Sequence, residues 1–248
     1  MTDFSAATIL ITGAASGIGA ATARLFKEKG AALILMDQDA TGLAGFSGAR
    51  VIIGDVADPL LWQEADLSGL THAVINAGVA NGGPSIADLD FSEWRRIMAT
   101  NLDGAFLSLS AAMRALRAGQ RGGAVLLLSS VAGIKAQPGI AAYAASKAAL
   151  IHLARVVALE GAADRIRVNA IAPAGVETPI WTSQQFFKDL AAAKGGEAEA
   201  FRELANDSTI LGRFAKAEEV ATQIAFLLSD QAALITGTCL VADGGYSL

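Results

Sequence analysis

A tyrosine and a lysine four residues apart form the pair with the clearest chemical potential in this chain. Tyr143 and Lys147 lie in a helix-forming stretch, where this spacing places two side chains on one face, about 5 to 6 Å apart at Cβ. A unit charge at about 4 Å is worth about 4 kcal/mol at an effective dielectric near 20. An ammonium group could therefore lower the phenol pKa from about 10 toward neutrality and make Tyr143 a general acid or base. Alone the pair is a weak signal, because a lysine stem also packs along aromatic rings on exposed helix faces.

Two serines stand upstream of this pair, at the end of an apolar run. Residues 124–128 are all apolar and predict a buried strand that delivers side chains at its carboxyl end. Ser130, thirteen residues before Tyr143, is the candidate hydroxyl for the site. Ser129 is the competing candidate, and alternation along a strand would face the two hydroxyls in opposite directions.

A glycine-rich loop near the start of the chain supplies a second type of site. Residues 8–11 form a β-branched apolar run, and a helical pattern extends from the loop to Lys29. Between them lie Gly13, Gly17 and Gly19. Glycines let the backbone turn tightly and approach phosphate oxygens, while a helix N-terminus offers free N–H groups and partial positive charge. Three glycines alone are a weak signal, but a strand before and a helix after them predict a dinucleotide site.

An aspartate follows the next predicted strand. Residues 32–36 are apolar and end in Asp37, eighteen residues after Gly19. A carboxylate here can accept hydrogen bonds from the adenosine ribose and would repel a 2′-phosphate. Positions 14–16 and 38 carry no Arg or Lys, so the sequence predicts NAD as cofactor and not NADP. The alternative is an ordinary aspartate that begins a loop, and the preceding glycine loop favours the cofactor role.

Taken together, these motifs resemble the short-chain dehydrogenase/reductase family, and the resemblance covers essentially the whole chain. The catalytic tetrad of the family matches Asn101, Ser130, Tyr143 and Lys147. The positions that the resemblance assigns to the cofactor are Gly13, Ser16, Gly17, Ile18, Gly19, Asp37, Asp55, Val56, Asn76, Ala77, Gly78, Tyr143, Lys147, Pro173, Gly175, Val176 and Thr178.

Several of these positions carry a specific implied role. Asp55 and Val56 correspond to the pair that meets the adenine, and residues 76–78 to the Asn-Ala-Gly turn after the fourth strand. Thr178 corresponds to the hydroxyl that meets the nicotinamide amide. Residues 243–245 match the closing turn of the family.

The resemblance implies an NAD-dependent oxidoreductase that moves a hydride between nicotinamide and a secondary alcohol or ketone. In the oxidation direction Tyr143 would take the hydroxyl proton and Ser130 would hold the substrate oxygen. Lys147 would lower the phenol pKa and bind the nicotinamide ribose, and Asn101 would support a water that carries the proton outward. The cofactor supplies the difficult chemistry, and the protein orients the reactants and polarises the substrate.

Two segments depart from the family pattern. The usual Pro-Gly after the sixth strand is replaced by Pro173-Ala174-Gly175, so the backbone beside the nicotinamide could differ. Residues 58–67 leave room for only a short helix where the family usually has a longer one. Both departures affect the outer layer more than the chemistry.

Composition and patterning predict one α/β domain over residues 1–248. Hydrophobic residues make up 53% of the chain, and strand-like runs alternate with helical ones, as in a parallel sheet with helices on both faces. The resemblance specifies a doubly wound Rossmann fold with seven parallel strands. It also makes residues 178–210 the substrate-binding lid, where Trp181, Phe186 and Phe187 could wall a pocket or pack between helices.

Charge and residue usage argue against several classes of function. A net charge of −5 with thinly spread basic residues predicts no nucleic-acid partner and no anionic membrane surface. The first residues lack a cationic leader pattern, which predicts a cytoplasmic protein. Charged residues within 141–160 argue against a membrane span. Cys239 has no cysteine partner, and the isolated His72 and His152 predict no metal site.

Two alternative functions remain at this point. A 3-oxoacyl-[acyl-carrier-protein] reductase would perform the same class of reaction, but such enzymes usually favour NADPH and present basic residues to an acidic carrier. A non-catalytic nucleotide-binding scaffold would not need all four tetrad residues. The favoured partner is a small-molecule alcohol or carbonyl compound, and the resemblance implies a homotetramer formed through the helices around residues 90–117 and 141–160.

Overall fold

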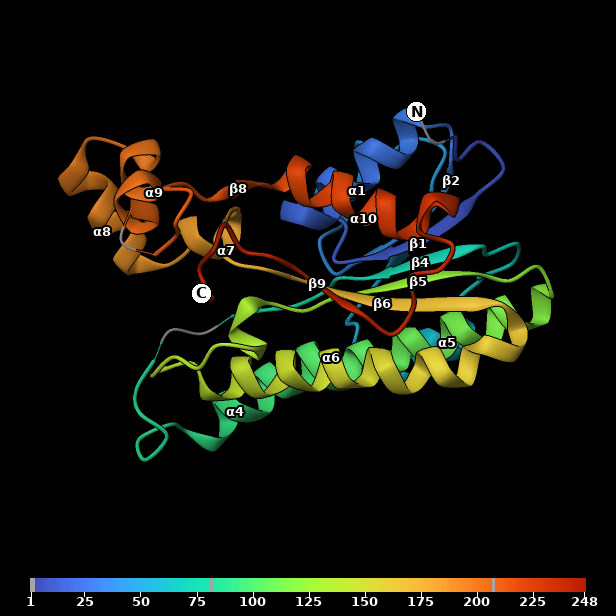
Figure 1. Ribbon diagram of the computed structural model, residues 1–248, viewed down its shortest axis with the longest axis horizontal. Coiled ribbons are helices and arrows are strands. Elements are labelled where there is room, and N and C mark those ends of the chain that lie inside the picture. The colour runs from blue at the N-terminus through green and yellow to red at the C-terminus, as the bar shows by residue number, and fades with distance from the viewer. Residues whose placement is uncertain (1–2, 81–82, 207) are drawn as a thin grey trace.

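A seven-stranded parallel sheet forms the centre of the computed structural model, which describes residues 3–80, 83–206 and 208–248 (Figure 1). Its strands are β1 (Thr8–Thr12), β2 (Ala32–Asp37), β3 (Arg50–Ile53), β4 (His72–Ile75), β5 (Gly123–Leu128), β6 (Ile166–Pro173) and β9 (Cys239–Ala242). They lie in the order β3-β2-β1-β4-β5-β6-β9. The chain runs outward from β1 to β3 and then returns to place β4 beside β1. Ligands of doubly wound folds bind at such a reversal, at the carboxyl ends of the strands.

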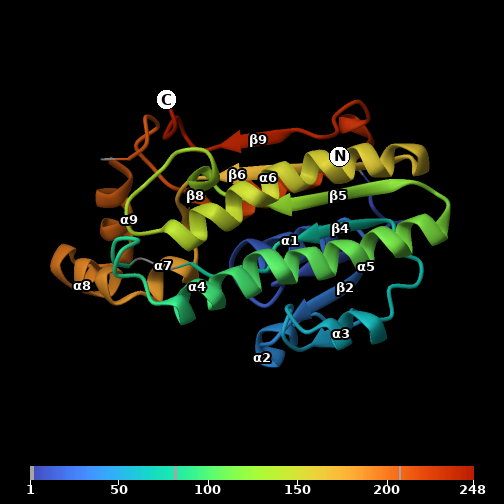
Figure 2. The same cartoon turned by 90° about the horizontal axis from the view of Figure 1, so that it is seen from below.

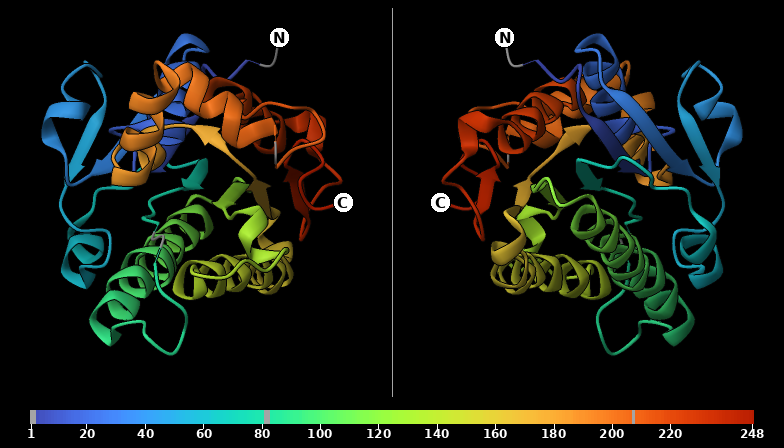
Figure 3. Two further views of the ribbon diagram at one scale, coloured as in Figure 1. Left: turned by 90° about the vertical axis from the view of Figure 1, so that its left-hand side faces the viewer. Right: turned by 90° about the vertical axis from the view of Figure 1, so that its right-hand side faces the viewer.

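Helices cover both faces of this sheet. In Figure 1, α1 and α10 lie above it and α4, α5 and α6 below it, and the end-on views of Figure 3 show the same two layers. The helices are α1 (Gly17–Glu28), α2 (Ala40–Leu43), α3 (Pro59–Glu64), α4 (Phe91–Met98), α5 (Gly104–Gly119), α6 (Ala141–Gly161), α7 (Pro179–Thr182), α8 (Gln185–Lys194), α9 (Glu197–Asn206) and α10 (Ala217–Leu228). The predicted doubly wound α/β fold with seven parallel strands is confirmed.

Alternation along the strands divides the core into two layers. Ile9 and Ile11 of β1 pack in the cluster that includes Phe26 of α1. Leu10 packs in the cluster between the sheet and the helices α5 and α6. All three β1 side chains are buried completely. A central parallel strand is covered on both faces, which is why residues 8–11 read as an uninterrupted apolar run.

Two helix predictions can be compared with the structure, the end of α1 and the short length of α3. Gly30 takes φ +81°, a conformation that favours glycine, directly after α1 and its cap residue Lys29. The short helix expected within residues 58–67 is α3, which begins after the Asp58 side chain accepts a hydrogen bond from the Leu60 N–H at 2.9 Å. The prediction of a shortened outer helix is confirmed.

A π-helical turn, Ala99–Asp103, joins α4 to α5 and contains Asn101. The sequence analysis expects helices around residues 90–117 and gives no sign of this widened turn. Single π-turns inside helices often mark functional positions.

Helices α7, α8 and α9 form a separate layer at one end of the sheet (Figure 2). In Figure 2 the arrowheads of β5 and β9 point toward the end where α7, α8 and α9 lie. A two-stranded pair, β7 (Val176–Glu177) with β8 (Ala215–Lys216), frames this segment. Its own apolar cluster contains Phe187, Phe201 and Phe214, with Trp181 packed against it.

The stretch Ala141–Asp164, which contains α6, has the length and apolar composition of a membrane-crossing helix, and an 18-residue window within it has a mean hydropathy of 1.3. Core helices of globular proteins meet the same criteria. Here Leu150, Ala154 and Val157 pack into the core cluster formed with β4, β5 and β6. The apolar composition of α6 is therefore explained by its place against the sheet.

Candidate active site

The glycine loop is folded tightly against the turn that follows β4. A Cβ atom on Gly19 would lie 1.9 Å from the carbonyl oxygen of Gly13, so only glycine fits there. Asn76 Nδ2 donates to the carbonyl oxygens of Thr12 at 2.8 Å and Gly13 at 3.1 Å. The N–H groups of Asn76 and Ala77 both donate to Thr12 Oγ1. Asn76 and Ala77, predicted to bind cofactor, thus fix the shape of the loop, and the Asn76 amide group is already engaged.

The start of α1 has the donors that a phosphate group requires. Ser16 is its exposed N-cap residue, but its side chain makes no capping hydrogen bond. The first turn carries no acidic residue, and Gly17 takes φ +51°. The N–H groups at Gly17, Ile18 and Gly19 therefore begin the helix without a side-chain acceptor. These residues fit the pyrophosphate of a dinucleotide.

Asp37 ends β2 beside this loop, where the sequence predicts it. Its carboxylate accepts hydrogen bonds from the N–H groups of Ala15 at 2.9 Å and Asp39 at 3.1 Å. Within the described part of the chain, no basic side chain is bonded to it. The Ala15 contact holds the carboxylate against the glycine loop, where an adenosine ribose would lie.

The predicted adenine pair is divided between surface and core. Asp55 is exposed and accepts a hydrogen bond from the Ala57 N–H at 2.9 Å. Val56 is buried, and a Cβ on Gly104 would lie 2.6 Å from its Cγ1 atom. Val56 also accepts a hydrogen bond from Trp62 Nε1 through its carbonyl oxygen. The short helix α3 therefore braces the backbone of this pair.

The structure brings Ser130, Tyr143 and Lys147 together between the end of β5 and the first turns of α6. Ser130 is buried, and its Oγ donates to the carbonyl oxygen of Pro173 at 3.5 Å. Its Oγ also accepts from the Ala132 N–H at 3.2 Å. The Nζ atom of Lys147 lies 5.6 Å from the centre of the Tyr143 ring and donates to the carbonyl oxygen of Leu128 at 2.8 Å.

Burial dominates the proton affinities of this group. It raises the pKa of Tyr143, against the smaller lowering effect of Ser130, and it lowers the pKa of Lys147 to about 8. The sequence argument expects Lys147 to depress the phenol pKa, whereas burial raises it. The Lys147 ammonium donates to the Leu128 carbonyl oxygen and lies 5.6 Å from the centre of the Tyr143 ring.

Asn101 is fully buried in the π-helical turn, and its side chain is completely engaged. Oδ1 accepts from the Val79 N–H at 2.8 Å, and Nδ2 donates to the Val79 carbonyl oxygen at 2.9 Å and to Ser146 Oγ at 3.2 Å. Gly78 lies between Asn101 and Lys147, because a Cβ on it would be 3.3 Å from Asn101 Oδ1 and from Lys147 Nζ. Asn101 therefore belongs to the same buried group as Lys147.

Ser129 faces away from Tyr143, as alternation requires. Its Oγ donates to the backbone carbonyl oxygen of Lys147 at 2.7 Å. The two neighbouring serines thus make different contacts, and it is Ser130 that influences the pKa of Tyr143.

The segment after β6 carries the last predicted cofactor positions. Pro173 ends β6, and Val176 is buried in β7. A Cβ on Gly175 would lie 2.4 Å from the ring of Phe214, so the inserted Ala174 is followed by a glycine that the lid cluster covers. Thr178 precedes α7, and its methyl group would be 3.4 Å from a Cβ on Gly17. The glycine loop and the start of the lid are therefore in contact.

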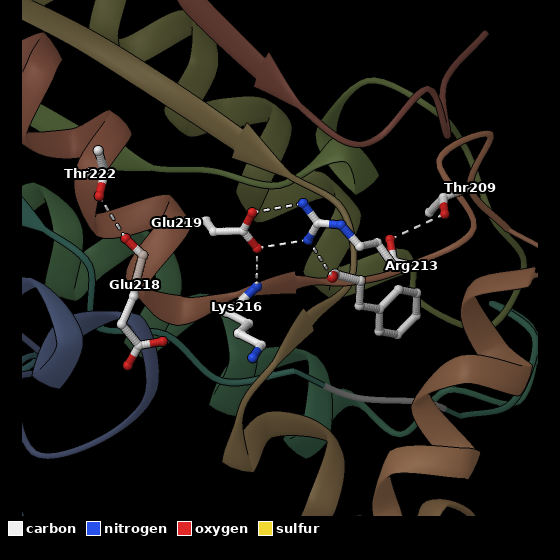
Figure 4. A network of polar contacts seen from close by, with 7 residues as sticks. Thr209, Arg213, Lys216, Glu218, Glu219 and Thr222 are labelled. Carbon is white, nitrogen blue, oxygen red and sulfur yellow. Dashed lines mark hydrogen bonds and ion pairs between the residues drawn. The ribbon is translucent and has the colours of Figure 1, made fainter.

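An ion pair anchors the other end of the lid (Figure 4). Both nitrogens at the tip of Arg213 donate to the Glu219 carboxylate at 2.7 Å, and the Lys216 N–H donates to it at 2.9 Å. The Arg213 guanidinium holds the pKa of Glu219 at about 2. Phe214, Arg213 and Ser146 carry no separate signal in the sequence, because nothing in it shows what faces them.

Comparison with known proteins agrees with this arrangement. A family model described as enoyl-(acyl carrier protein) reductase matches residues 13–247. The chain is 35% identical over 261 residues to cis-4-hydroxycyclohexanecarboxylate dehydrogenase of Sinomonas cyclohexanicum, covering 98% of both chains. It belongs to the short-chain dehydrogenase/reductase family. It is also 36% identical to 2-(S)-hydroxypropyl-CoM dehydrogenase 3 of Xanthobacter autotrophicus, covering 96% and 95% of the two chains.

Solved structures of the family superpose closely on this one. The 3-ketoacyl-(acyl-carrier-protein) reductase of Brucella melitensis, complexed with NADH, has a TM-score of 0.84 and 29% identity, with 98% of each chain covered. The L-sorbose reductase of Gluconobacter frateurii, complexed with NADPH and L-sorbose, has a TM-score of 0.90 and 28% identity, with 98% and 97% covered. The chain is thus an oxidoreductase of this family that acts on CH–OH groups with a nicotinamide cofactor.

Proposed function

We propose that this short-chain dehydrogenase/reductase interconverts a small secondary alcohol and its ketone with NAD as cofactor and Tyr143 as general acid/base. The observation that carries the proposal is the group formed by the buried Ser130 and Lys147 with the partly buried Tyr143 at the carboxyl end of the sheet. It lies on the same sheet edge as the uncapped start of α1. A buried lysine is costly to keep, so its presence beside the Tyr143 phenol supports a chemical role.

The nicotinamide, when bound, accepts the hydride from the alcohol carbon or returns it to the ketone carbon. In the oxidation direction, the ionised phenolate of Tyr143 takes the hydroxyl proton and becomes a neutral phenol as the hydride leaves, and the C–O bond becomes a carbonyl. Ser130 donates a hydrogen bond to the same oxygen and stabilises its partial negative charge. Reduction reverses these steps, with the Tyr143 phenol as proton donor.

Lys147 has two roles in this proposal. It would bind the ribose of the nicotinamide nucleotide, exchanging its bond to the Leu128 carbonyl oxygen for the ribose hydroxyls. Its charge would also favour the ionised phenol. Because the Asn101 side-chain amide is engaged by Val79 and Ser146, the backbone carbonyl group of this turn would hold the water that carries the proton outward.

The preference for NAD rests on Asp37 and on the absence of a basic residue bonded to it in the described chain. We assign residues 178–210 to the substrate lid. Phe187 is fully buried and packs against Phe201, so only Trp181 and the half-exposed Phe186 remain to wall a pocket. Kinetics on a panel of secondary alcohols with NAD and with NADP test the proposal, and no hydride transfer with any of them would contradict it.

A 3-oxoacyl-[acyl-carrier-protein] reductase activity is the second candidate. It is supported by the likeness to the NADH-bound enzyme of Brucella melitensis, which shows that this activity is compatible with the fold. A 3-oxoacyl thioester in the same panel separates the two, because only the second candidate would turn it over faster than simple ketones.

We further propose a cytoplasmic homotetramer. The helices α5 and α6 expose apolar side chains that a monomer would leave in water, namely Phe106, Val156 and Leu159. Exposed apolar patches of this kind indicate contact surfaces.

A further inference from the structure

We propose that Ser129 is a positioning residue for Lys147, a role that rests on the function proposed above. Ser129 is only 3% exposed, and its Oγ donates to the Lys147 backbone carbonyl oxygen at 2.7 Å. The preceding residue, Leu128, accepts the Lys147 ammonium at 2.8 Å. Two consecutive residues at the end of β5 therefore hold Lys147 at both of its ends.

Gly133 contacts the same part of the α6 backbone through the turn that follows β5. A Cβ on Gly133 would lie 2.7 Å from the Lys147 carbonyl carbon and 2.8 Å from the Ala148 nitrogen. The 3₁₀ turn Val131–Gly133 thus packs directly on the peptide unit that receives the Ser129 hydrogen bond. Sideways movement of α6 at this point is restricted by the serine hydroxyl and by the glycine backbone together.

The Ser129 hydrogen bond is additional to those that build the helix. Lys147 lies inside α6, where its carbonyl oxygen is the regular acceptor for the N–H four residues later, and a carbonyl oxygen has a second lone pair. Loss of the hydroxyl therefore leaves the helix intact. What changes is the placement of α6, which carries Tyr143 and Lys147, relative to the strand end that carries Ser130. Misplacement of this kind lowers rates strongly.

The Lys147 ammonium reports directly on this placement. Burial is the cause that lowers its pKa to about 8, with no contribution from a neighbouring charge. If α6 shifts when the Ser129 hydrogen bond is lost, the ammonium gains access to water and its pKa rises toward 10.5. Lysine side chains labelled with carbon-13 next to the amine allow this titration to be followed by NMR, and the Lys147→Met variant identifies the resonance by its absence.

Ser129→Ala should raise the pKa of Lys147 by about one unit and lower kcat about tenfold. Ser108→Ala is the matched control, because Ser108 is completely buried in α5 and its Oγ also donates to a carbonyl oxygen at 2.7 Å, that of Gly104. The control should keep the Lys147 titration of the wild type, and Ser129→Thr, which retains a hydroxyl, should restore it.

An unchanged Lys147 titration in Ser129→Ala, or an equal shift in Ser108→Ala, would overturn the proposal. The NMR titration needs neither substrate nor cofactor. A failure of the alcohol panel would therefore contradict the proposed function without altering this result, and the two proposals fail independently.

Discussion

At the scale of single residues, the site combines a partly buried phenol with a buried lysine, and burial disfavours the charged form of each. The pKa of Tyr143 is raised and that of Lys147 is lowered, so both groups are driven toward their neutral forms. A bound dinucleotide would add hydrogen-bond acceptors for Lys147 near Tyr143. The resting protein is therefore prepared for catalysis by geometry more than by charge.

Removal of the phenolic hydroxyl is the direct test of the acid/base role. Tyr143→Phe keeps the ring and its packing but has no transferable proton, so kcat should fall by roughly 10² to 10⁴. Cofactor affinity, measured by titration of the NADH fluorescence, should remain close to that of the wild type. Tyr246→Phe is the control, since it removes the other tyrosine of the chain and should leave kcat unchanged. Near-normal turnover by Tyr143→Phe would refute the assignment.

The buried Lys147 ammonium should lower the free energy of unfolding at neutral pH. A pKa lowered from 10.5 to about 8 corresponds to about 3 kcal/mol at about 1.4 kcal/mol per unit. The penalty is fully present below about pH 8, because both folded and unfolded chains are then protonated. It disappears as the pH rises through the unfolded value, because the unfolded chain binds the proton longer than the folded one.

Lys147→Met should therefore be more stable than the wild type at pH 7, by about 2 kcal/mol once the lost hydrogen bond to Leu128 is subtracted. Urea unfolding at pH 7 and at pH 9.5 measures the difference, which should shrink at the higher pH. A wild type that is more stable than Lys147→Met at pH 7 would show that the ammonium is not penalised by burial. Activity should nevertheless be lost in the variant.

Asp37 should decide between the two nicotinamide cofactors. The 2′-phosphate of NADP carries about −1.5 to −2 charges, and like charges at about 4 Å repel by about 4 kcal/mol at an effective dielectric near 20. With a threefold reduction for solvent exposure, NAD should still exceed NADP by about tenfold in kcat/KM. Asp37→Ala should narrow this gap, mainly by weakening NAD. A wild type that prefers NADP would overturn the role of Asp37 without affecting Tyr143.

At the scale of elements, the site depends on close backbone contacts that only glycine permits. The glycine loop touches the turn after β4 on one side and the start of the lid on the other. Gly175 lies under the ring of Phe214 in the same way. At Gly13 and Gly19 the close neighbours include main-chain atoms, whereas at Gly17 and Gly175 they are the side chains of Thr178 and Phe214.

Gly19→Ala should therefore abolish cofactor binding. Its Cβ would lie 1.9 Å from the Gly13 carbonyl oxygen, a distance that forces the loop to open. Calorimetric titration with NAD should show an affinity lower by at least about 100-fold, equivalent to about 2.8 kcal/mol. Gly45→Ala is the control, because a Cβ there meets no atom within 4 Å. Wild-type affinity in Gly19→Ala would mean that the loop moves away from this contact freely.

At the scale of the whole molecule, the apolar outer faces of α5 and α6 require an explanation that a single chain does not provide. Leu159 is 82% exposed, and Phe106 and Val156 are exposed as well. Assembly of four chains through these helices would remove such side chains from water, at a gain of about 25 cal/mol for each Å² of apolar surface.

Leu159→Glu should dissociate the proposed tetramer, because a carboxylate would be buried without a partner. Light scattering of the purified protein gives its mass directly. Leu234→Glu is the control, since Leu234 is fully exposed and lies outside both helices. A wild type that is monomeric at micromolar concentrations would refute the assembly, and dissociation by both variants would show that charge alone is responsible.

The sequence by itself was sufficient for the fold and for the candidate site residues. Apolar runs that alternate with helical patterns predict the parallel sheet. A strand that is buried on both faces, such as residues 8–11, can be recognised from its apolar composition. The glycine loop, Asp37, Ser130 and the Tyr143–Lys147 pair are all local patterns, so they can be recognised without knowing what lies opposite them.

Only the tertiary structure decided how these residues act on one another. The direction of the Tyr143 pKa depends on the protein packed around the phenol, and the engagement of Asn101 depends on Val79 and on a π-helical turn that no local pattern announces. Ser129 and Ser130 are neighbours in the sequence, but Ser129 donates to the backbone of α6 and Ser130 to the carbonyl oxygen of Pro173 at the end of β6. The burial of a side chain and its distance from other groups depend on segments far apart in the chain. A local sequence pattern contains neither quantity.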